Sequence, residues 1–267
     1  MSNDLFKKIL ELKQELSASD SSTDISNANR KKLLQQISEL TDELEIFSRS
    51  VDLVRPPEAF FDPTNPEITA GIVSLALIAQ DRQSLEHLTK FYGAGIYALY
   101  YTGNSVVYSA ISGSETPIYI GKASPKGNPK TFKEQGPKLF SRLNEHKRNI
   151  EKVSGIMIAD FEYRYLAVQS GFESAAEDRL ISTFKPIWNK ETNLLFGIGK
   201  HGDSAKTRQN NKSPFDTVHP GRKWAEGNSE KESRSDIIAK VQHHLKTSKI
   251  YKNQDELIKS FLNDLKV

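Results

Sequence analysis

Two short blocks rich in aromatic and β-branched residues constrain the fold of this chain most. Residues 95–101 read GIYALYY and residues 117–123 read PIYIGKA, and this composition favours strands. The segment between them contains Gly103, Asn104 and Gly113, which are typical of turns. We therefore predict that the two blocks form an antiparallel hairpin joined by a long turn.

Regular patterns after the hairpin extend the predicted core. Residues 136–151 carry apolar side chains at helical spacing, and residues 161–168 (FEYRYLAV) alternate like a strand. Residues 172–184 predict a second helix, which Pro186 stops. The order β-β-α-β-α predicts an α+β fold, in which a small mixed or antiparallel three-stranded sheet is flanked by helices.

Further elements are expected on both sides of this core. Residues 51–66 contain four prolines and predict an irregular linker arm, and residues 196–224 predict a long polar loop. A loop of that length is usually functional or disordered. The other predicted helices cover residues 66–80 (with Asn65 as N-cap), 84–91, 234–245 and 254–265.

The N-terminal 50 residues carry two apolar seams. Their members alternate at spacings of three and four residues, as in a coiled coil: Leu5, Ile9, Leu12 and Leu16, then Leu33, Ile37, Leu40, Leu44 and Phe47. Each predicts a helix too short to be stable alone. The two helices either pair as a hairpin, lie on their own domain, or pack against another subunit.

Composition narrows the class of protein. The chain has no cysteine, which excludes disulfides and thiolate metal sites. Its N-terminus lacks a signal-peptide core, and its longest apolar run, residues 71–79, is too short to span a bilayer. We expect a soluble cytoplasmic protein with no membrane partner.

The net charge of +3 is small, but its distribution is uneven. Residues 122–148 hold eight Lys or Arg against two acidic residues. Such a cluster either attracts a polyanion or is simply a solvated basic surface.

The two strand blocks carry a family resemblance. The triplets GIY (95–97) and YIG (119–121) resemble the signature of the GIY-YIG nucleases. That family has an Arg and a His four residues apart on the first helix, a Glu on the next helix and an Asn soon after it. The sequence matches this order, so the resemblance implies six site residues: Tyr97, Tyr119, Arg142, His146, Glu177 and Asn189.

These residue types suit phosphodiester hydrolysis, which needs an activated water and a cation beside the phosphate. Arg142 and His146 are i,i+4 neighbours, so one helical face presents both. The resemblance implies a relay of the water's proton through Tyr97 and His146. It also implies that Tyr119 orients the water or phosphate, that Glu177 holds Mg²⁺ or Mn²⁺, and that Asn189 braces the site.

A more specific resemblance involves residues 91–101, 117–127 and 216–225. These segments are similar to the GIY-YIG branch of type II restriction endonucleases that cut the palindrome CCGCGG. The resemblance implies double-stranded DNA as substrate and a homodimer or homotetramer as the working form. The candidate DNA-contacting residues are Lys122, Lys200, Arg208, Arg222 and Lys223. All except Lys122 lie in the predicted loop 196–224.

Five segments follow from this interpretation. They are a helical, oligomerising segment (1–50), a linker arm and helix (51–90), the GIY-YIG catalytic core (91–195), a basic DNA-contacting loop (196–230) and the C-terminal helices (231–267). Two other functions stay open. One is a structure-specific repair or recombination nuclease of the same family, and the other is a non-catalytic DNA-binding protein on a nuclease scaffold.

Overall fold

The computed structural model describes residues 2–18, 26–52, 54, 57, 62, 64–169, 171–199 and 211–264. The chain divides into an N-terminal unit, Met1–Glu58, and a C-terminal unit, Ala59–Val267. Each unit is described by itself.

The N-terminal unit contains the two predicted helices, α1 (Ser2–Ala18) and α2 (Asn27–Val51). The Ser26 side chain caps α2 by accepting a hydrogen bond from the backbone of Asn29. Every large apolar side chain described on the two helices is exposed. The described residues of this unit therefore do not form a hairpin with a shared apolar core.

A four-stranded sheet organises the C-terminal unit, with the order β1-β4-β2-β3 and every described pair antiparallel. The three predicted strands are confirmed as β2 (Gly95–Tyr101), β3 (Tyr119–Ala123) and β4 (Phe161–Ala167). The fourth, β1 (Gln83–Ser84), pairs with β4. The predicted helix at 84–91 is wrong, because its first residue belongs to β1 and turns follow it.

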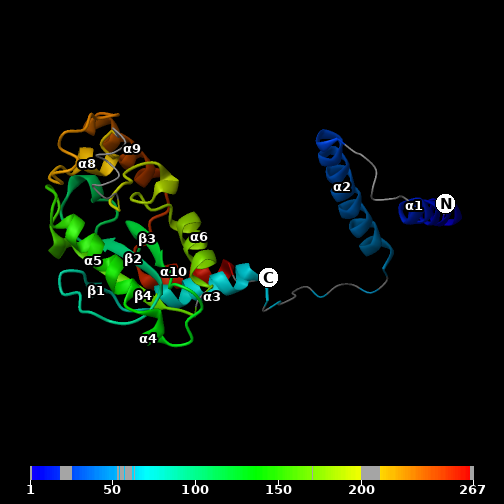
Figure 1. The fold of residues 1–267 in the computed structure, drawn as a ribbon, viewed down its shortest axis with the longest axis horizontal. Coiled ribbons are helices and arrows are strands. Elements are labelled where there is room, and N and C mark those ends of the chain that lie inside the picture. Colours follow the sequence, from blue (N-terminus) through cyan, green and yellow to red (C-terminus); the bar gives the residue numbers. More distant parts are fainter. Residues whose placement is uncertain are drawn as a thin grey trace. The chain divides into compact units, whose positions relative to one another are not determined.

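Helices cover both faces of the sheet (Figure 1). On one face α5 (Lys138–Ile150) packs against Tyr97, Leu99 and Tyr101 of β2. The alternate β2 residues, Ile96, Ala98 and Tyr100, face the other side. Three helices cover that side: α3 (Pro66–Ile78), α6 (Glu173–Phe184) and α10 (Gln254–Asp264). Because β2 is buried on both faces, its sequence is a continuous apolar run, unlike that of a half-exposed strand.

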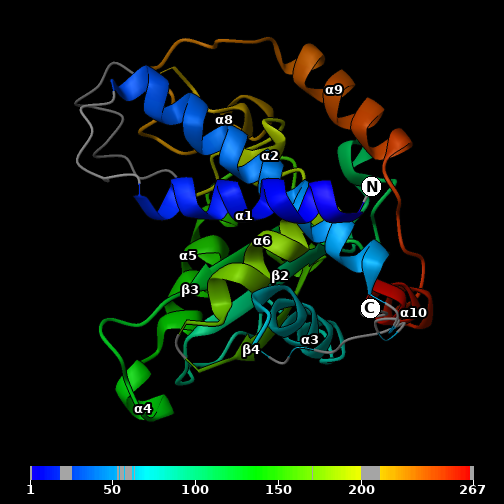
Figure 2. The same cartoon turned by 90° about the vertical axis from the view of Figure 1, so that its right-hand side faces the viewer.

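Further elements complete the C-terminal unit, and Figure 2 shows α4, α8 and α9 from a second side. They are η1 (Val106–Tyr108), α4 (Phe132–Gln135), η2 (Ile158–Asp160), η3 (Lys190–Thr192), α8 (Pro214–Val218) and α9 (Arg234–Thr247). The α8 helix lies inside the predicted loop 196–224, so that expectation is wrong for this part. The Ser213 hydroxyl caps α8, and Phe215 is fully buried.

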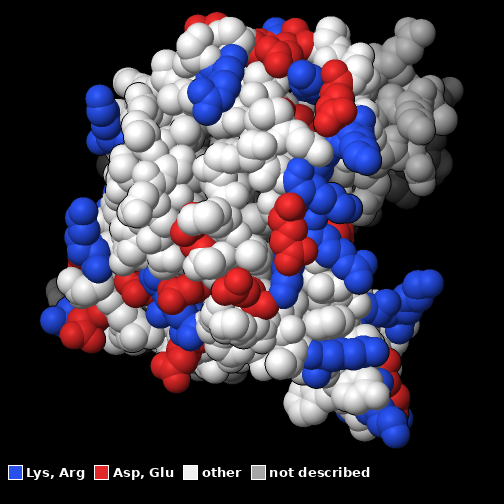
Figure 3. All heavy atoms as spheres, turned by 90° about the vertical axis from the view of Figure 1, so that its left-hand side faces the viewer, with Lys and Arg blue, Asp and Glu red and all other residues white. Residues whose placement is uncertain are grey.

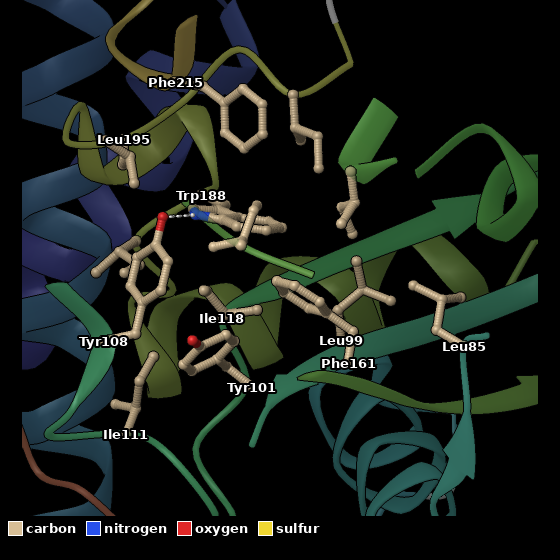
Figure 4. Close-up of a cluster of buried hydrophobic side chains, with 14 of the residues drawn as sticks. Leu85, Leu99, Tyr101, Tyr108, Ile111, Ile118, Phe161, Trp188, Leu195 and Phe215 are labelled. Carbon is tan, nitrogen blue, oxygen red and sulfur yellow. Dashed lines mark hydrogen bonds between the residues drawn. The ribbon is translucent and has the colours of Figure 1, made fainter. Parts of the chain in front are cut away.

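An aromatic cluster joins these short elements to the sheet (Figure 4). Trp188, which follows α6, lies between Tyr108 of η1, Phe161 of β4 and Phe215 of α8, with ring centroids 5.2–6.0 Å apart. The rings of Trp188 and Phe215 meet edge to face, an arrangement that aromatic pairs favour. The turn regions after β2, after α6 and before α9 are thereby fixed against one core.

The described residues include no helix with both the length and the apolar character that a membrane span requires.

Candidate active site

A buried tyrosine–histidine pair links the sheet to α5. The Tyr97 hydroxyl of β2 is hydrogen-bonded to Nε2 of His146 on α5, at 2.8 Å, and both side chains are fully buried. The second ring nitrogen of His146, Nδ1, has no hydrogen-bond partner among the described residues. The protein therefore does not fix which nitrogen carries the proton, and the pair can share it across the Tyr97 bond.

The second signature tyrosine joins this pair from the neighbouring strand. The Tyr119 ring lies 4.7 Å from the His146 ring and 6.0 Å from the Tyr97 ring, measured between centroids. Gly121 lies opposite Tyr97 in the β2–β3 register. A Cβ at Gly121 would lie 2.6 Å from the Tyr97 hydroxyl oxygen and 2.8 Å from the Tyr119 ring. The glycine of the YIG block is therefore required by the two tyrosines that pack over it.

Arg142 brings a permanent positive charge to the same place. It precedes His146 by one helical turn on α5, and its side chain is 40% exposed. Its Nη1 atom lies 2.6 Å from the Glu145 carboxylate. The guanidinium thus stays accessible while its charge acts on Tyr97 and Tyr119.

Burial stabilises the neutral forms of Tyr97, Tyr119 and His146. Desolvation raises the pKa of Tyr97 well above its usual value, and that of Tyr119 also rises for the same reason. Desolvation, assisted by the Arg142 charge, lowers the pKa of His146 from 6.5 to about 3. Moving a proton from Tyr97 to His146 therefore needs a negative charge near the imidazole to stabilise the resulting cation.

Two carboxamides hold the strands that carry the tyrosines. The Asn189 side chain accepts from the backbone N–H of Ile120 at 2.9 Å and donates to its carbonyl at 2.8 Å. It thereby replaces a neighbouring strand at the free edge of β3. Gln135 instead bridges two neighbouring segments, since it accepts from Ala94, just before β2, and donates to Val168, just after β4. Sequence reasoning missed Gln135, because its partners lie 41 and 33 residues away and no local pattern indicates them.

Glu177 approaches from the opposite face of the sheet. It lies on α6 with a side chain that is 16% exposed, and its Oε2 atom is 3.0 Å from Nζ of Lys122 on β3. Burial raises the pKa of Glu177, while the Lys122 ammonium works against that rise. The negative charge of Glu177 also raises the pKa of Tyr119, so the two groups act on one another across the edge strand.

The structure therefore groups the six predicted residues at the β2–β3 edge of the sheet. Tyr97, Tyr119 and His146 are in direct contact and Arg142 acts on them electrostatically. The Asn189 side chain bonds to the backbone of β3 as given above, and Glu177 reaches the site through Lys122 and the charge effect on Tyr119.

The five predicted DNA-contacting residues are less uniform. Lys223 is exposed beside a surface hollow that Asn149, Lys152 and Trp224 also line. Lys200 and Arg208 lie outside the described residues. Lys122 is ion-paired with Glu177, as described above.

The prediction that Arg222 contacts DNA needs a correction. Its side chain is 1% exposed, and its Nε atom lies 2.6 Å from the Asp216 carboxylate. It also donates to the backbone carbonyls of Gly197 and Ile198. The guanidinium therefore joins residues 197–198 to α8 and is enclosed by protein. Its position does not support the prediction of a DNA contact through Arg222.

The Lys and Arg side chains are unevenly distributed over the surface. Figure 3 shows more Lys and Arg side chains towards one side of a face of the molecule, with Asp and Glu side chains among them and broad areas without charge beside them. Within the basic segment 122–148, Lys126, Lys130, Lys133 and Arg148 are exposed. Exposed cations that lie close together in the sequence suit contact with a polyanion such as DNA.

The GIY and YIG blocks lie on the neighbouring strands β2 and β3 of the sheet, beside the tyrosine–histidine pair and Arg142. The chain matches the Eco29kI GIY-YIG domain over residues 89–245, which is more than half of its length, and it belongs to this family of restriction endonucleases. No curated protein matches the chain.

Proposed function

We propose that the protein is a type II restriction endonuclease that cuts double-stranded DNA at the palindrome CCGCGG with the help of Mg²⁺ or Mn²⁺. The observation that carries this proposal is the buried Tyr97–His146 hydrogen bond beside the Arg142 charge. The particular site rests on the resemblance of residues 91–101, 117–127 and 216–225 to the enzymes that cut it.

The residues present fit a divalent cation held by one carboxylate. Glu177 is mostly buried, and its carboxylate already lies beside the Lys122 ammonium. Among the described residues no group of three or more His, Cys, Asp or Glu side chains could hold a metal. One carboxylate supplemented by water and phosphate oxygens suits Mg²⁺. When bound, the ion supplies Lewis acidity beside the phosphate.

The protein's own residues then move a proton and stabilise charge. As Tyr97 accepts a proton from the attacking water, its own proton passes to Nε2 of His146. The approaching DNA phosphate raises the pKa of His146 from its value of about 3, so the imidazole becomes able to take that proton. Arg142 offers a planar cation to the phosphate oxygens as negative charge builds up on them.

The oligomeric state follows from symmetry. The chain contains one set of site residues, while a palindromic double-strand cut needs two. We expect a homodimer whose two-fold axis matches that of the DNA. The exposed apolar seams of α1 and α2 can pair two dimers into a homotetramer, or they can belong to the dimer itself.

Digestion of plasmid and phage DNA with Mg²⁺ tests the function. We expect discrete fragments that end at CCGCGG. Smearing or cutting confined to branched DNA supports the repair-nuclease alternative, and DNA binding without any cutting supports the non-catalytic one.

The Glu177→Gln variant tests the metal carboxylate. It should abolish cleavage and leave DNA binding intact, because it removes the charge that holds the cation and little else. Asp178→Asn, which removes an exposed carboxylate on the same helix, is the matched control and should cut like the wild type. Cutting by the Gln variant, or cutting in EDTA, contradicts the proposed metal role.

Sedimentation of the same preparations tests the assembly. The full chain should sediment as a dimer or tetramer, and a chain beginning near Val51 should form a smaller assembly if the seams join dimers. A full chain that sediments as a dimer rules out the tetramer. A monomer that makes both cuts without pairing contradicts the symmetry argument.

A further inference from the structure

The ion pair between Lys122 and Glu177 joins the edge strand β3 to α6. The Lys122 ammonium also donates to the Ser174 hydroxyl, at 3.1 Å, one turn before Glu177 on the same helix. The lysine side chain is 35% exposed and the glutamate side chain 16% exposed. The carboxylate is thus sheltered while the cation that pairs with it borders solvent.

This arrangement differs from a structural ion pair in the same molecule. Arg222 and Asp216 are both almost completely enclosed, and backbone carbonyls take further donors of the guanidinium. Lys122 contacts the ends of two side chains and carries its charge on a flexible stem of four carbons. Its ammonium can leave the carboxylate by rotation of that stem, without movement of the backbone.

We propose that Lys122 is an exchangeable counter-ion of Glu177. Its ammonium holds the carboxylate in the metal-free protein and is displaced when a divalent cation binds there. The released ammonium then faces the DNA phosphate beside the edge of β3. The inference rests on the proposed role of Glu177 as the metal carboxylate.

Competition on one carboxylate has a physical consequence. Two cations at hydrogen-bonding distance from the same oxygens repel each other, so metal binding without DNA must first remove the ammonium. Once DNA is present, its phosphate accepts the displaced ammonium and compensates for the lost ion pair. Metal and DNA therefore strengthen each other's binding through Lys122, and this coupling is reciprocal. The metal-loaded site then assembles mainly on bound DNA.

Mn²⁺ binding without DNA tests the inference independently of cleavage. Titration calorimetry, or electron spin resonance of free Mn²⁺, measures the affinity of the full-length protein and of its variants. Lys122→Met keeps the length of the side chain and removes its charge, and Lys122→Arg keeps the charge. Lys126→Met, an exposed lysine four residues further along, is the matched control.

We expect Lys122→Met to bind Mn²⁺ roughly tenfold more tightly than the wild type, a typical size for coupling between two sites. Lys122→Arg and Lys126→Met should bind like the wild type. A duplex with phosphorothioate linkages, which resists cleavage, should strengthen Mn²⁺ binding to the wild type and have less effect on Lys122→Met. Melting curves of each variant establish that it is folded.

Two failures are distinguishable. If Glu177→Gln weakens Mn²⁺ binding and Lys122→Met binds no more tightly than the wild type, the exchange is wrong and the metal carboxylate stands. If Glu177→Gln binds Mn²⁺ as well as the wild type does, the proposed metal role of Glu177 is wrong, and the exchange is overturned with it.

Discussion

The described residues include two buried tyrosine–histidine pairs, and the pairs differ in what surrounds them. Tyr97 and His146 connect β2 to α5, while Tyr108 of η1 is hydrogen-bonded to Nε2 of His219, which directly follows α8. All four side chains are buried, and burial lowers the pKa of both histidines below 6.5. Residue type and burial alone do not distinguish the two pairs.

The hydrogen bonds of the two histidines distinguish the pairs. Nδ1 of His219 lies 3.1 Å from the carbonyl oxygen of Ser154, which can only accept. His219 therefore carries its proton on Nδ1, and its Nε2 accepts from the Tyr108 hydroxyl. The Tyr108 oxygen in turn accepts from Nε1 of Trp188 at 3.1 Å, the bond drawn in Figure 4. Each donor in this series has one acceptor, and the donors run in one direction from Trp188 through Tyr108 and His219 to the Ser154 carbonyl.

The His146 ring has no such constraint, because its Nδ1 lacks a partner among the described residues. Arg142 and Tyr119 also act on the pair to which it belongs. The comparison teaches that a buried histidine with both nitrogens satisfied fixes structure. The unassigned nitrogen of His146, next to the accessible cation of Arg142, is what supports the proposed proton transfer.

The largest expected difference between the pairs is in cleavage rate. Tyr97→Phe should lower the rate by roughly 10²–10⁴-fold, the usual contribution of a positioned proton-transfer group. Tyr108→Phe, the matched control, should leave the rate per folded molecule close to that of the wild type. Single-turnover digestion measures both.

A double variant sharpens this prediction. If Tyr97 and His146 act as one relay, Tyr97→Phe with His146→Ala should be little slower than either single variant. Additive losses contradict the relay, and an equal loss in Tyr108→Phe contradicts the division of roles between the two pairs.

The order reverses for stability. Tyr108→Phe removes one hydroxyl and leaves two buried atoms unpaired, Nε2 of His219 and Nε1 of Trp188. Such losses cost about 1–3 kcal/mol in unfolding free energy. Tyr97→Phe unpairs Nε2 of His146 and removes an oxygen that also interacts with Tyr119 and Arg142. Because Arg142 borders solvent and keeps its pair with Glu145, the loss should be smaller than for Tyr108→Phe. Urea unfolding of the two variants measures this, and a larger loss for Tyr97→Phe contradicts the comparison.

The features that could be predicted from the sequence are those with a local pattern, whereas contacts between distant residues could not be measured without the fold. Strands β2, β3 and β4 and helices α5 and α6 were predictable because their apolar patterns are local. The six site residues followed from a family resemblance in which order along the chain is enough. The resemblance also implied the relay between Tyr97 and His146, 49 residues apart, but the length of their hydrogen bond and the burial of both side chains needed the fold itself.

The errors have tertiary causes. The strand β1 consists of the polar residues Gln83 and Ser84, and it exists because β4 offers a free edge for pairing. Arg222 belongs to a basic run in the sequence, yet Asp216, six residues earlier, withdraws its charge into the core. The Tyr108–His219 pair went unnoticed because its members are 111 residues apart and no local pattern marks either one.

The smallest expected difference between the pairs is in the pH dependence of stability, where they behave alike. The pKa of His219 is lowered from 6.5 to about 4 by burial, as that of His146 is lowered to about 3. Between pH 6.5 and these values the unfolded chain binds protons that the folded chain does not. Stability is therefore fully present above pH 6.5 and falls as the pH drops towards 4.

Replacing His219 by Asn removes one of these protons from the balance. Unfolding free energies between pH 7.5 and 4.5 should thus fall less steeply for His219→Asn than for the wild type, and likewise for His146→Asn. His243→Asn, which changes an exposed histidine on α9, should keep the wild-type slope. An unchanged slope in His219→Asn means that this imidazole already binds its proton in the folded state. The directed chain from Trp188 to Ser154 would then be wrong, because it requires an unprotonated Nε2.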